Sequence, residues 1–349
     1  MRKHSKKIAF IPLGGEDISI GSYRIWVKDY CQYMKNIGIN AKIAPMINDQ
    51  VIQENDIIVL GKGPPALSAR VVEYVSRKYP SKIVGAITPP GDLTTVPYDF
   101  VMVGSMEEAD SLSFHKNVIV NAHIESLYYD SEPKIHEHKD TLKICVHGWT
   151  AHLASFAPNL KWALEEYEKE QDFELVVISE KTDLSSWSKG RPNIKNIVSK
   201  KWDLNTIKSN IQECDIGIVP GVHDLTDKLE IVDPANGKFE TDYIFRFKNK
   251  CNNGRALVYF QLGIPTVLDF SPSHLHILGD GDCGYLAHSK HGWLRALRLL
   301  KDFNNRNTVS RNALNKVNQE YNPSIWADRY YQALHKIHDD KQQEVNNER

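Results

Sequence analysis

Residues 248–269 read KNKCNNGRALVYFQLGIPTVLD, and this stretch decides the fold class of the chain. A basic, polar loop leads through Asn253 and Gly254 into an amphipathic run that predicts a helix. Gly263 is suited to end that helix and Pro265 prevents its continuation, after which a β-branched strand begins. A loop, a helix and a strand in this order are typical of an α/β domain.

The start of this predicted helix is also a candidate anion-binding site. A helix N-terminus carries partial positive charge and N–H groups without acceptors inside the helix, so it suits a phosphate. Basic side chains surround it. The predicted phosphate site consists of Lys248, Lys250, Asn252, Asn253, Gly254 and Arg255. The alternative that these residues leave open is an ordinary loop–helix–strand connection with no ligand.

Alternation of strands and helices continues on both sides of this stretch, which predicts parallel sheets covered by helices on both faces. Strands are expected in the first half at residues 7–13, 41–44, 56–60, 82–87, 100–103 and 117–120. In the second half they are expected at residues 142–146, 173–178, 196–199, 215–219 and 266–268. Helices are expected at residues 22–37, 158–169, 207–214, 293–300, 308–320 and 324–338, with a polar, frayed end beyond residue 339.

A chain of 349 residues is too long for one typical core, so we expect two Rossmann-like α/β domains. The first domain covers residues 1–128, and the polar segment 129–140 (YDSEPKIHEHKD) reads as a linker. The second domain covers residues 141–322. Residues 323–349 form a last helix with an apolar stripe, followed by the polar tail.

Composition excludes several classes of protein. The net charge of −1 gives no support for general nucleic-acid binding, and no apolar run is long enough to span a bilayer. No signal-peptide core follows Met1. The 5 cysteines are odd in number and lack CxxC spacing, which argues against a disulfide framework or a zinc site. We therefore expect a cytoplasmic protein.

Several segments together carry a resemblance to a known family. In the second half they are residues 142–149 with 158–169, the DIGIVP run 215–220, residues 253–267, and residues 284–287 with 293–300. In the first half they are Gly14-Gly15 and the GSYR run 21–24. These segments resemble the nucleotide-sugar domain and the glycine loop of the GT-B-fold glycosyltransferases, in particular the group-1 (family 4-like) class. The resemblance implies two Rossmann-like domains facing across a cleft, with the C-terminal helix crossing back to the N-terminal domain.

The resemblance also implies a function. It implies a hexosyltransferase-type glycosyltransferase that transfers a sugar from a UDP- or GDP-linked donor to a glycan acceptor, in cell-surface polysaccharide or glycoconjugate synthesis. No cofactor and no metal are expected, because cations and helix amides can stabilise a departing diphosphate. A lipid-linked acceptor would bring the protein to the inner face of the membrane as a peripheral protein.

Site residues follow from the same resemblance and from position in the fold. The predicted phosphate site would hold the donor diphosphate. The donor sugar and nucleotide would contact Ser179, Glu180, Gly221, His223 and Asp224. The acceptor side and glycine loop would comprise Gly14, Gly15, Ser22, Arg24 and Asp92. No residue stands out as a general base, so none is assigned as catalytic.

One departure from the family leaves alternatives open. The family commonly has two glutamates at E-x7-E spacing; here Asp224 falls at the first position and Val258 near the second, with an insertion between them. The alternatives are an epimerase or hydrolase of nucleotide sugars, or a non-catalytic GT-B-like partner subunit. We interpret the histidine pairs 136/138 and 274/276 as scattered residues rather than metal ligands, and the Asp-Gly-Asp run 280–282 as a surface turn.

Overall fold

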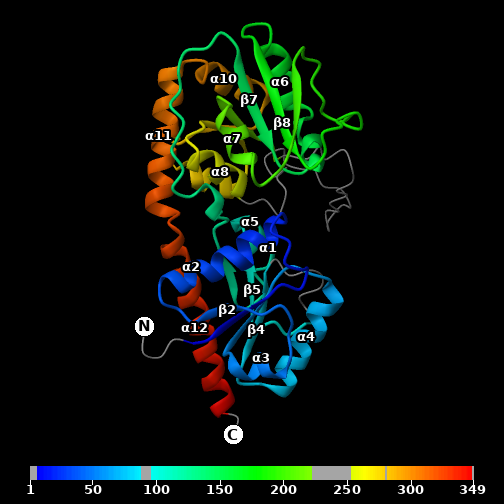
Figure 1. Ribbon diagram of the computed structural model, residues 1–349, viewed down its shortest axis with the longest axis vertical. Helices are drawn as coiled ribbons and strands as arrows, with labels where there is room; N and C mark the ends of the chain where they lie inside the picture. Colours follow the sequence, from blue (N-terminus) through cyan, green and yellow to red (C-terminus); the bar gives the residue numbers. More distant parts are fainter. Residues whose placement is uncertain (1–5, 88–95, 222–252, 280, 348–349) are drawn as a thin grey trace, which may run out of the picture. The chain divides into compact units, whose positions relative to one another are not determined.

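The computed structural model describes residues 6–87, 96–221, 253–279 and 281–347, and the chain divides into two compact units (Figure 1). Unit 1 combines Met1–Leu127 with Gln319–Arg349, and unit 2 is Tyr128–Asn318. Each unit contains one parallel, 6-stranded sheet with helices around it. The α/β fold expected from the alternating pattern is therefore confirmed.

The sheet of unit 1 has the order β2-β1-β3-β4-β5-β6. Its strands are β1 (Ile8–Ile11), β2 (Ala41–Ile43), β3 (Ile57–Leu60), β4 (Ile83–Ile87), β5 (Phe100–Val103) and β6 (Val118–Val120). Every residue of β1, β3, β4 and β5 is buried. Continuous apolar strands are typical of a parallel sheet covered on both faces, which explains why the sequence predicted all of these strands.

Helices of unit 1 cover this sheet. They are α1 (Gly21–Tyr23), η1 (Arg24–Asp29), α2 (Tyr30–Asn36), α3 (Asp49–Glu54), α4 (Pro65–Lys78), α5 (Met106–Ser111) and α12 (Pro323–Asn347), with the short turn η2 (Ser126–Tyr128) after β6. The helix expected at residues 22–37 is thus three consecutive segments, and η1 in the middle is a π-helix. The amide of Tyr30 donates to the carbonyl of Ile25, five residues earlier, as this wider turn requires.

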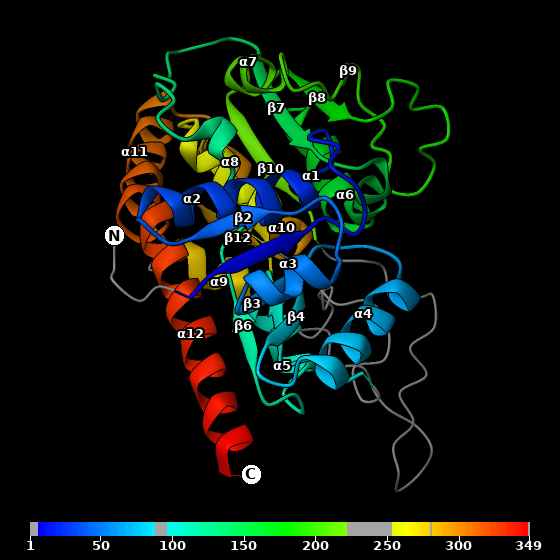
Figure 2. The ribbon, with the colours of Figure 1, turned by 60° about the horizontal axis from the view of Figure 1, so that its bottom comes forward.

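Helix α12 packs in unit 1 against α2 and β4 (Figure 2). Tyr330 and Leu334 belong to the same buried cluster as Ile8 of β1. The helix extends to Asn347, so the fraying expected beyond residue 339 is wrong. The reason is a tertiary anchor: Lys341 Nζ lies 2.6 Å from Asp99 Oδ1 and 3.0 Å from the carbonyl of Lys82.

The sheet of unit 2 has the order β12-β11-β10-β7-β8-β9. Its strands are β7 (Leu142–His147), β8 (Phe173–Ser179), β9 (Ile197–Lys201), β10 (Ile216–Val219), β11 (Thr266–Asp269) and β12 (Tyr285–Ala287). All five strands expected here are present, and β12 adds one that was not specified. The helical segments are η3 (Thr150–Phe156), α6 (Asn159–Tyr167), α7 (Ile207–Gln212), α8 (Gly254–Gln261), α9 (Pro272–Leu278), α10 (Lys290–Leu299) and α11 (Phe303–Glu320).

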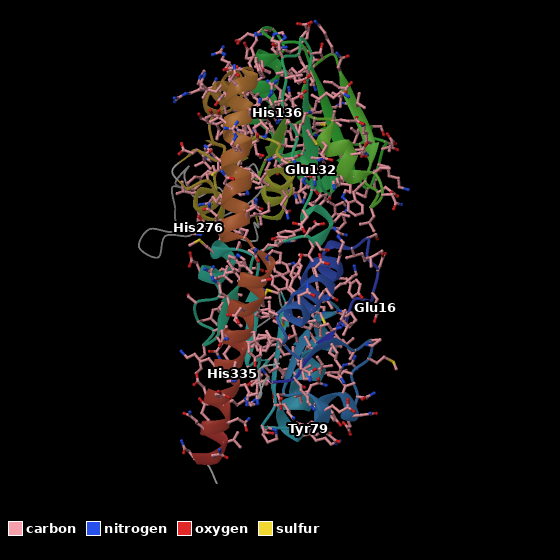
Figure 3. The ribbon with its side chains drawn as sticks, turned by 60° about the vertical axis from the view of Figure 1, so that its left-hand side comes forward. Glu16, Tyr79, Glu132, His136, His276 and His335 are labelled. Carbon is pink, nitrogen blue, oxygen red and sulfur yellow. The ribbon has the colours of Figure 1, made fainter. Side chains whose placement is uncertain are left out.

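The segment ahead of β7 is attached to unit 2 by specific polar contacts. The backbone N–H and carbonyl of His136 bond to the Asn307 side chain of α11, each at 2.8 Å (Figure 3). Lys134 and Lys139 place their ammonium groups 3.0 Å and 2.8 Å from Asp215 Oδ1, at the amino end of β10. This stretch, expected to be a linker, is therefore an ordered part of unit 2.

Within the described ranges, no helix is both long enough and apolar enough to cross a membrane.

Candidate functional site

The carboxyl edge of the unit 2 sheet provides the setting for a binding site. Strands β7 and β10 are neighbours in the middle of the sheet, and the chain continues from β7 toward β8 but from β10 toward β11. Such a reversal separates the two loops that leave the strands, and ligands of open parallel sheets bind in the crevice at this point. The loops here begin at Gly148 and at Pro220.

Helix α8 begins beside this reversal. Its N-cap is Asn253, whose side chain makes no capping hydrogen bond to the helix. Asn253 Oδ1 is buried and has no hydrogen-bond partner within the described part of the chain. The partial positive charge of the helix N-terminus therefore lies at this edge of the sheet.

The side chain of Arg255 brings the ends of β7 and β10 together. Its Nη2 donates to the carbonyl of Pro220 at 3.2 Å, and its Cδ lies 3.4 Å from the position that a Cβ on Gly148 would take. Gly148 has φ +130, a conformation that residues with a side chain rarely adopt. Glycine is thus favoured at position 148 by the backbone, and a Cβ there would meet Arg255 Cδ only at van der Waals contact distance.

His147, the last residue of β7, lies beneath the start of α8. Burial, together with the charge of Arg255, lowers the pKa of His147 from 6.5 to about 3, and a hydrogen bond to the Arg255 backbone opposes this shift. The imidazole is therefore neutral near pH 7, and its ring meets the Tyr259 ring edge-on with centroids 5.0 Å apart. The charge at this end of the helix is consequently that of Arg255 and not of the histidine.

Tyr259 fixes α8 on the sheet. Its hydroxyl donates to the carbonyl of Cys145 in β7 at 2.8 Å. Its ring covers Gly217 of β10, where a Cβ would meet the ring carbons at 2.7 Å. These two contacts hold α8 against the sheet, so the N-terminus of α8 and Arg255 keep a constant position relative to β7 and β10.

The end of β8 contributes two of the residues expected to contact the donor. Ser179 is turned inward, because its side chain is 2% exposed and its hydroxyl donates to the carbonyl of Lys181 at 2.7 Å. Glu180 accepts from the backbone N–H of Thr150 at 3.0 Å and from the Thr150 hydroxyl. Glu180 therefore joins the loop after β8 to the loop after β7, at the same edge as Arg255.

In unit 1 the residues expected on the acceptor side divide into two groups. Gly14, Gly15 and Ser22 line one small pocket, together with Gly61 and Lys62 of the loop after β3. The two glycine loops meet backbone to backbone, since a Cβ on Gly14 would lie 2.5 Å from the carbonyl oxygen of Lys62.

Arg24 lies apart from that group, with its side chain buried. Its guanidinium pairs with Glu125 at 2.9 Å, and its Nη1 donates to the carbonyl of Ile18 at 2.7 Å. Arg24 is 6% exposed and Glu125 is 9% exposed, so this arrangement holds the loop before the helix rather than presenting a charge to solvent.

Comparison with solved structures places this architecture among known folds. The structure of sucrose-phosphate synthase from Thermosynechococcus elongatus matches with a TM-score of 0.63 and 10% identity, covering 95% of this chain and 99% of that one. A glycosyltransferase from Rickettsia africae matches with a TM-score of 0.58 and 12% identity, over 96% and 99% of the two chains. HepE from Anabaena, solved with UDP and glucose, matches with a TM-score of 0.56 and 11% identity, over 95% and 100%.

This chain has the GT-B fold. The expectation of two Rossmann-like domains of GT-B type is therefore confirmed. No protein-family model matches the sequence, and no curated protein matches it either. The identity to the solved structures is low, so the likeness is one of fold.

Within this GT-B fold, six of the predicted site residues fall outside the described part of the chain. They are Asp92, His223, Asp224, Lys248, Lys250 and Asn252. Val258, at the position of the second family glutamate, is 2% exposed and belongs to the buried side of α8. Among the described residues no three His, Cys, Asp or Glu side chains come together as a metal site would require.

A buried acid at the end of β11 lies at the candidate site and was not named by the sequence analysis. Asp269 is 3% exposed, and its Oδ2 accepts from the N–H of Gly221 at 3.4 Å. Its Oδ1 faces His288 Nδ1, also at 3.4 Å. The only local signal was an acid that ends the apolar strand TVLD at the carboxyl edge of a parallel sheet. Gly221, expected at the donor, is thus held between Arg255 and Asp269.

Proposed function

We propose that the protein is a metal-independent glycosyltransferase that transfers a sugar from a nucleoside-diphosphate sugar, UDP- or GDP-linked, to a glycan acceptor. The observation that carries the proposal is the position of Arg255 and the N-terminus of α8 at the sheet reversal of a GT-B fold. HepE, which is similar in fold, was solved with UDP and glucose, and this supports a nucleotide sugar as the donor.

The chemistry explains why a cation is needed there. In the transfer, the bond from the anomeric carbon to the diphosphate breaks, a bond to an acceptor oxygen forms, and the acceptor loses a proton. Negative charge develops on the departing diphosphate, and fixed positive charge stabilises it without reorganisation. Arg255 and the helix N-terminus would supply that charge, with Lys248, Lys250 and Asn252 as further ligands proposed from the sequence.

The remaining assignments belong to the same proposal. Glu180 and Gly221 would border the donor nucleotide and sugar, while Gly14, Gly15 and Ser22 would border the acceptor. A role in polysaccharide or glycoconjugate synthesis, a cytoplasmic location and a lipid-linked acceptor at the inner membrane face are proposed on the resemblance to the group-1 class.

Calorimetric titration with UDP, GDP, CDP and ADP in the presence of EDTA tests the donor site. We expect one diphosphate family to bind, and Arg255→Ala to weaken that binding by roughly a hundredfold, as expected for the loss of two charge-assisted hydrogen bonds. Arg311→Ala, an exposed arginine of α11 in the same unit, is the matched control and should leave the affinity unchanged. Unchanged affinity in Arg255→Ala would refute the site.

A non-catalytic GT-B partner subunit is the second candidate, and the burial of Val258 where the family commonly has a ribose-binding acid favours it. Turnover separates the candidates. A transferase consumes its sugar nucleotide only with an acceptor, whereas an epimerase or hydrolase turns it over alone. A partner subunit would bind the donor weakly and convert none of it.

A further inference from the structure

One peptide group at the end of β10 connects Arg255 to the buried acid of β11. The carbonyl of Pro220 accepts from Arg255 Nη2 at 3.2 Å, and the N–H of the same peptide, which belongs to Gly221, donates to Asp269 Oδ2 at 3.4 Å. We propose that Asp269 is a positioning residue, which acts through this peptide to orient the Arg255 guanidinium for a nucleoside diphosphate. The inference rests on the proposed function.

The carboxylate of Asp269 is itself held from several sides. Its Oδ1 accepts from the N–H of Phe270 at 2.8 Å and lies 3.4 Å from His288 Nδ1, in the segment after β12. Its backbone carbonyl accepts from Nδ1 of His274 at 2.7 Å, and His274 is fully buried in α9. Because a buried carboxylate requires hydrogen bonds on its oxygens, these contacts fix its position relative to the peptide.

A fixed carboxylate that accepts from the N–H of a peptide group makes the carbonyl oxygen of the same peptide a stronger hydrogen-bond acceptor. Hydrogen bonds in series polarise one another, so the Pro220 carbonyl becomes a better acceptor when the Gly221 N–H is bonded to a carboxylate. An arginine side chain has many rotamers, and restricting them before the ligand arrives reduces the entropy that binding costs. Asp269 would thereby raise diphosphate affinity without touching the ligand.

A double-mutant cycle tests this action through Arg255. The variants are Asp269→Asn, Arg255→Ala and their combination, and the measurement is the Kd for the diphosphate that the wild-type protein binds, among UDP, GDP, CDP and ADP. Asp269→Asn should weaken binding by about tenfold in the wild-type background, the size of one charge-assisted hydrogen bond. In the Arg255→Ala background it should change the Kd less than twofold, because the group it orients is gone.

A purely structural role for Asp269 predicts a different pattern. It would weaken binding equally in both backgrounds, and additive losses would therefore overturn the proposal. The matched control is Asp215→Asn, another fully buried carboxylate of unit 2, paired with Lys134 and Lys139 at the opposite edge of the sheet. It should lower the melting temperature and leave the Kd unchanged.

The corresponding nucleoside monophosphate supplies a second measurement on the same variants. Since Arg255 is proposed to serve the diphosphate, Asp269→Asn should weaken diphosphate binding more than monophosphate binding. If Asp269→Asn does not fold, Asp269→Ser, which keeps an acceptor oxygen without the charge, takes its place in the cycle. Wild-type protein that binds no diphosphate would refute the proposed function. Wild-type binding with undiminished affinity in the Asp269 variant would overturn this inference alone.

Discussion

Gly148 is the residue at which the backbone and the candidate site constrain each other most directly. Its φ of +130 disfavours any side chain, and the space where a Cβ would go is bounded at 3.4 Å by Arg255 Cδ and by His152. We expect Gly148→Ala to strain the backbone at the end of β7, lower the free energy of unfolding by about 1–2 kcal/mol and, by shifting that backbone beside Arg255, weaken diphosphate binding severalfold. Chemical denaturation and calorimetric titration measure the two effects.

Gly38→Ala is the control that separates the effect of backbone strain on stability from the effect of a shifted Arg255 on binding. Gly38 also has a positive φ, +81, but nothing lies within 4 Å of its missing Cβ, and it belongs to unit 1. It should show a loss of stability with no change in affinity. If Gly148→Ala behaves in the same way as Gly38→Ala, Gly148 does not position Arg255.

The Arg24–Glu125 pair gives a second prediction at this scale. Removing one member of a buried ion pair leaves the other charge uncompensated, so Glu125→Gln should destabilise unit 1 by about 3 kcal/mol or more. The exposed pair Lys42–Glu54 is the comparison, and Glu54→Gln should destabilise the unit far less, because solvent screens this pair. Urea unfolding of both variants measures the difference, and equal costs would contradict a structural role for Arg24.

At the scale of elements, the strands could be predicted because burial dominates their sequence. Segments such as Ile57–Leu60 and Phe100–Val103 are apolar at every position, and a parallel sheet covered on both faces requires that. The extra length of α12 could not be predicted, because its last turns are polar and depend on residues more than 200 positions away.

The anchor of those last turns can be tested in α12 itself. Lys341→Ala removes the ion pair to Asp99 and the hydrogen bond to Lys82, so the end of α12 should fray and the melting temperature of unit 1 should fall by a few degrees. Lys336→Ala, on the exposed face of the same helix, should have no such effect. Faster amide hydrogen exchange confined to residues 339–347 in Lys341→Ala would locate the fraying, and unchanged exchange there would contradict it.

In the candidate site, too, features formed by neighbouring residues could be predicted from the sequence, and contacts between distant residues could not. The helix start at Asn253 and Gly254, which we propose binds an anion, could be predicted because glycine, asparagine and a basic loop are neighbours along the chain. The contacts of Arg255 with Pro220 and of Asp269 with Gly221 join residues 35 and 48 positions apart. Sequence pattern carries no signal for such pairs, so neither the burial of Arg24 against Glu125 nor the place of Asp269 beside Gly221 could be predicted.

For the whole molecule, buried histidines set a dependence of stability on pH, and His136 and His147 supply it in unit 2. Burial lowers the pKa of His136 to about 4 and that of His147 to about 3, both from 6.5. The contribution of these histidines to the free energy of unfolding is complete above pH 6.5. It is lost as the pH falls, because the unfolded chain then takes up protons that the folded chain does not. Between pH 6.5 and 4 each should lower the free energy of unfolding by about 1.4 kcal/mol per pH unit.

Substitution isolates this contribution from that of the carboxylates. His136→Gln retains a donor for the carbonyl of Gly263, and His147→Gln retains a polar side chain at the end of β7. Each variant should show a shallower fall in urea-unfolding stability from pH 6.5 to 4.5, by one proton per molecule. An unchanged slope in both variants would mean that neither histidine is held neutral in the folded state.

The assignment of α12 to unit 1 has a consequence for the order in which the protein can form on the ribosome. Unit 2 is continuous, so all of its strands have been synthesised when Asn318 emerges. Unit 1 begins before unit 2 but needs Tyr330 and Leu334 to cover Ile8 and Phe10, and these two residues are made after the whole of unit 2. Until these residues have been synthesised, part of the apolar surface of the unit 1 sheet stays exposed, so unit 2 can finish folding before unit 1 does.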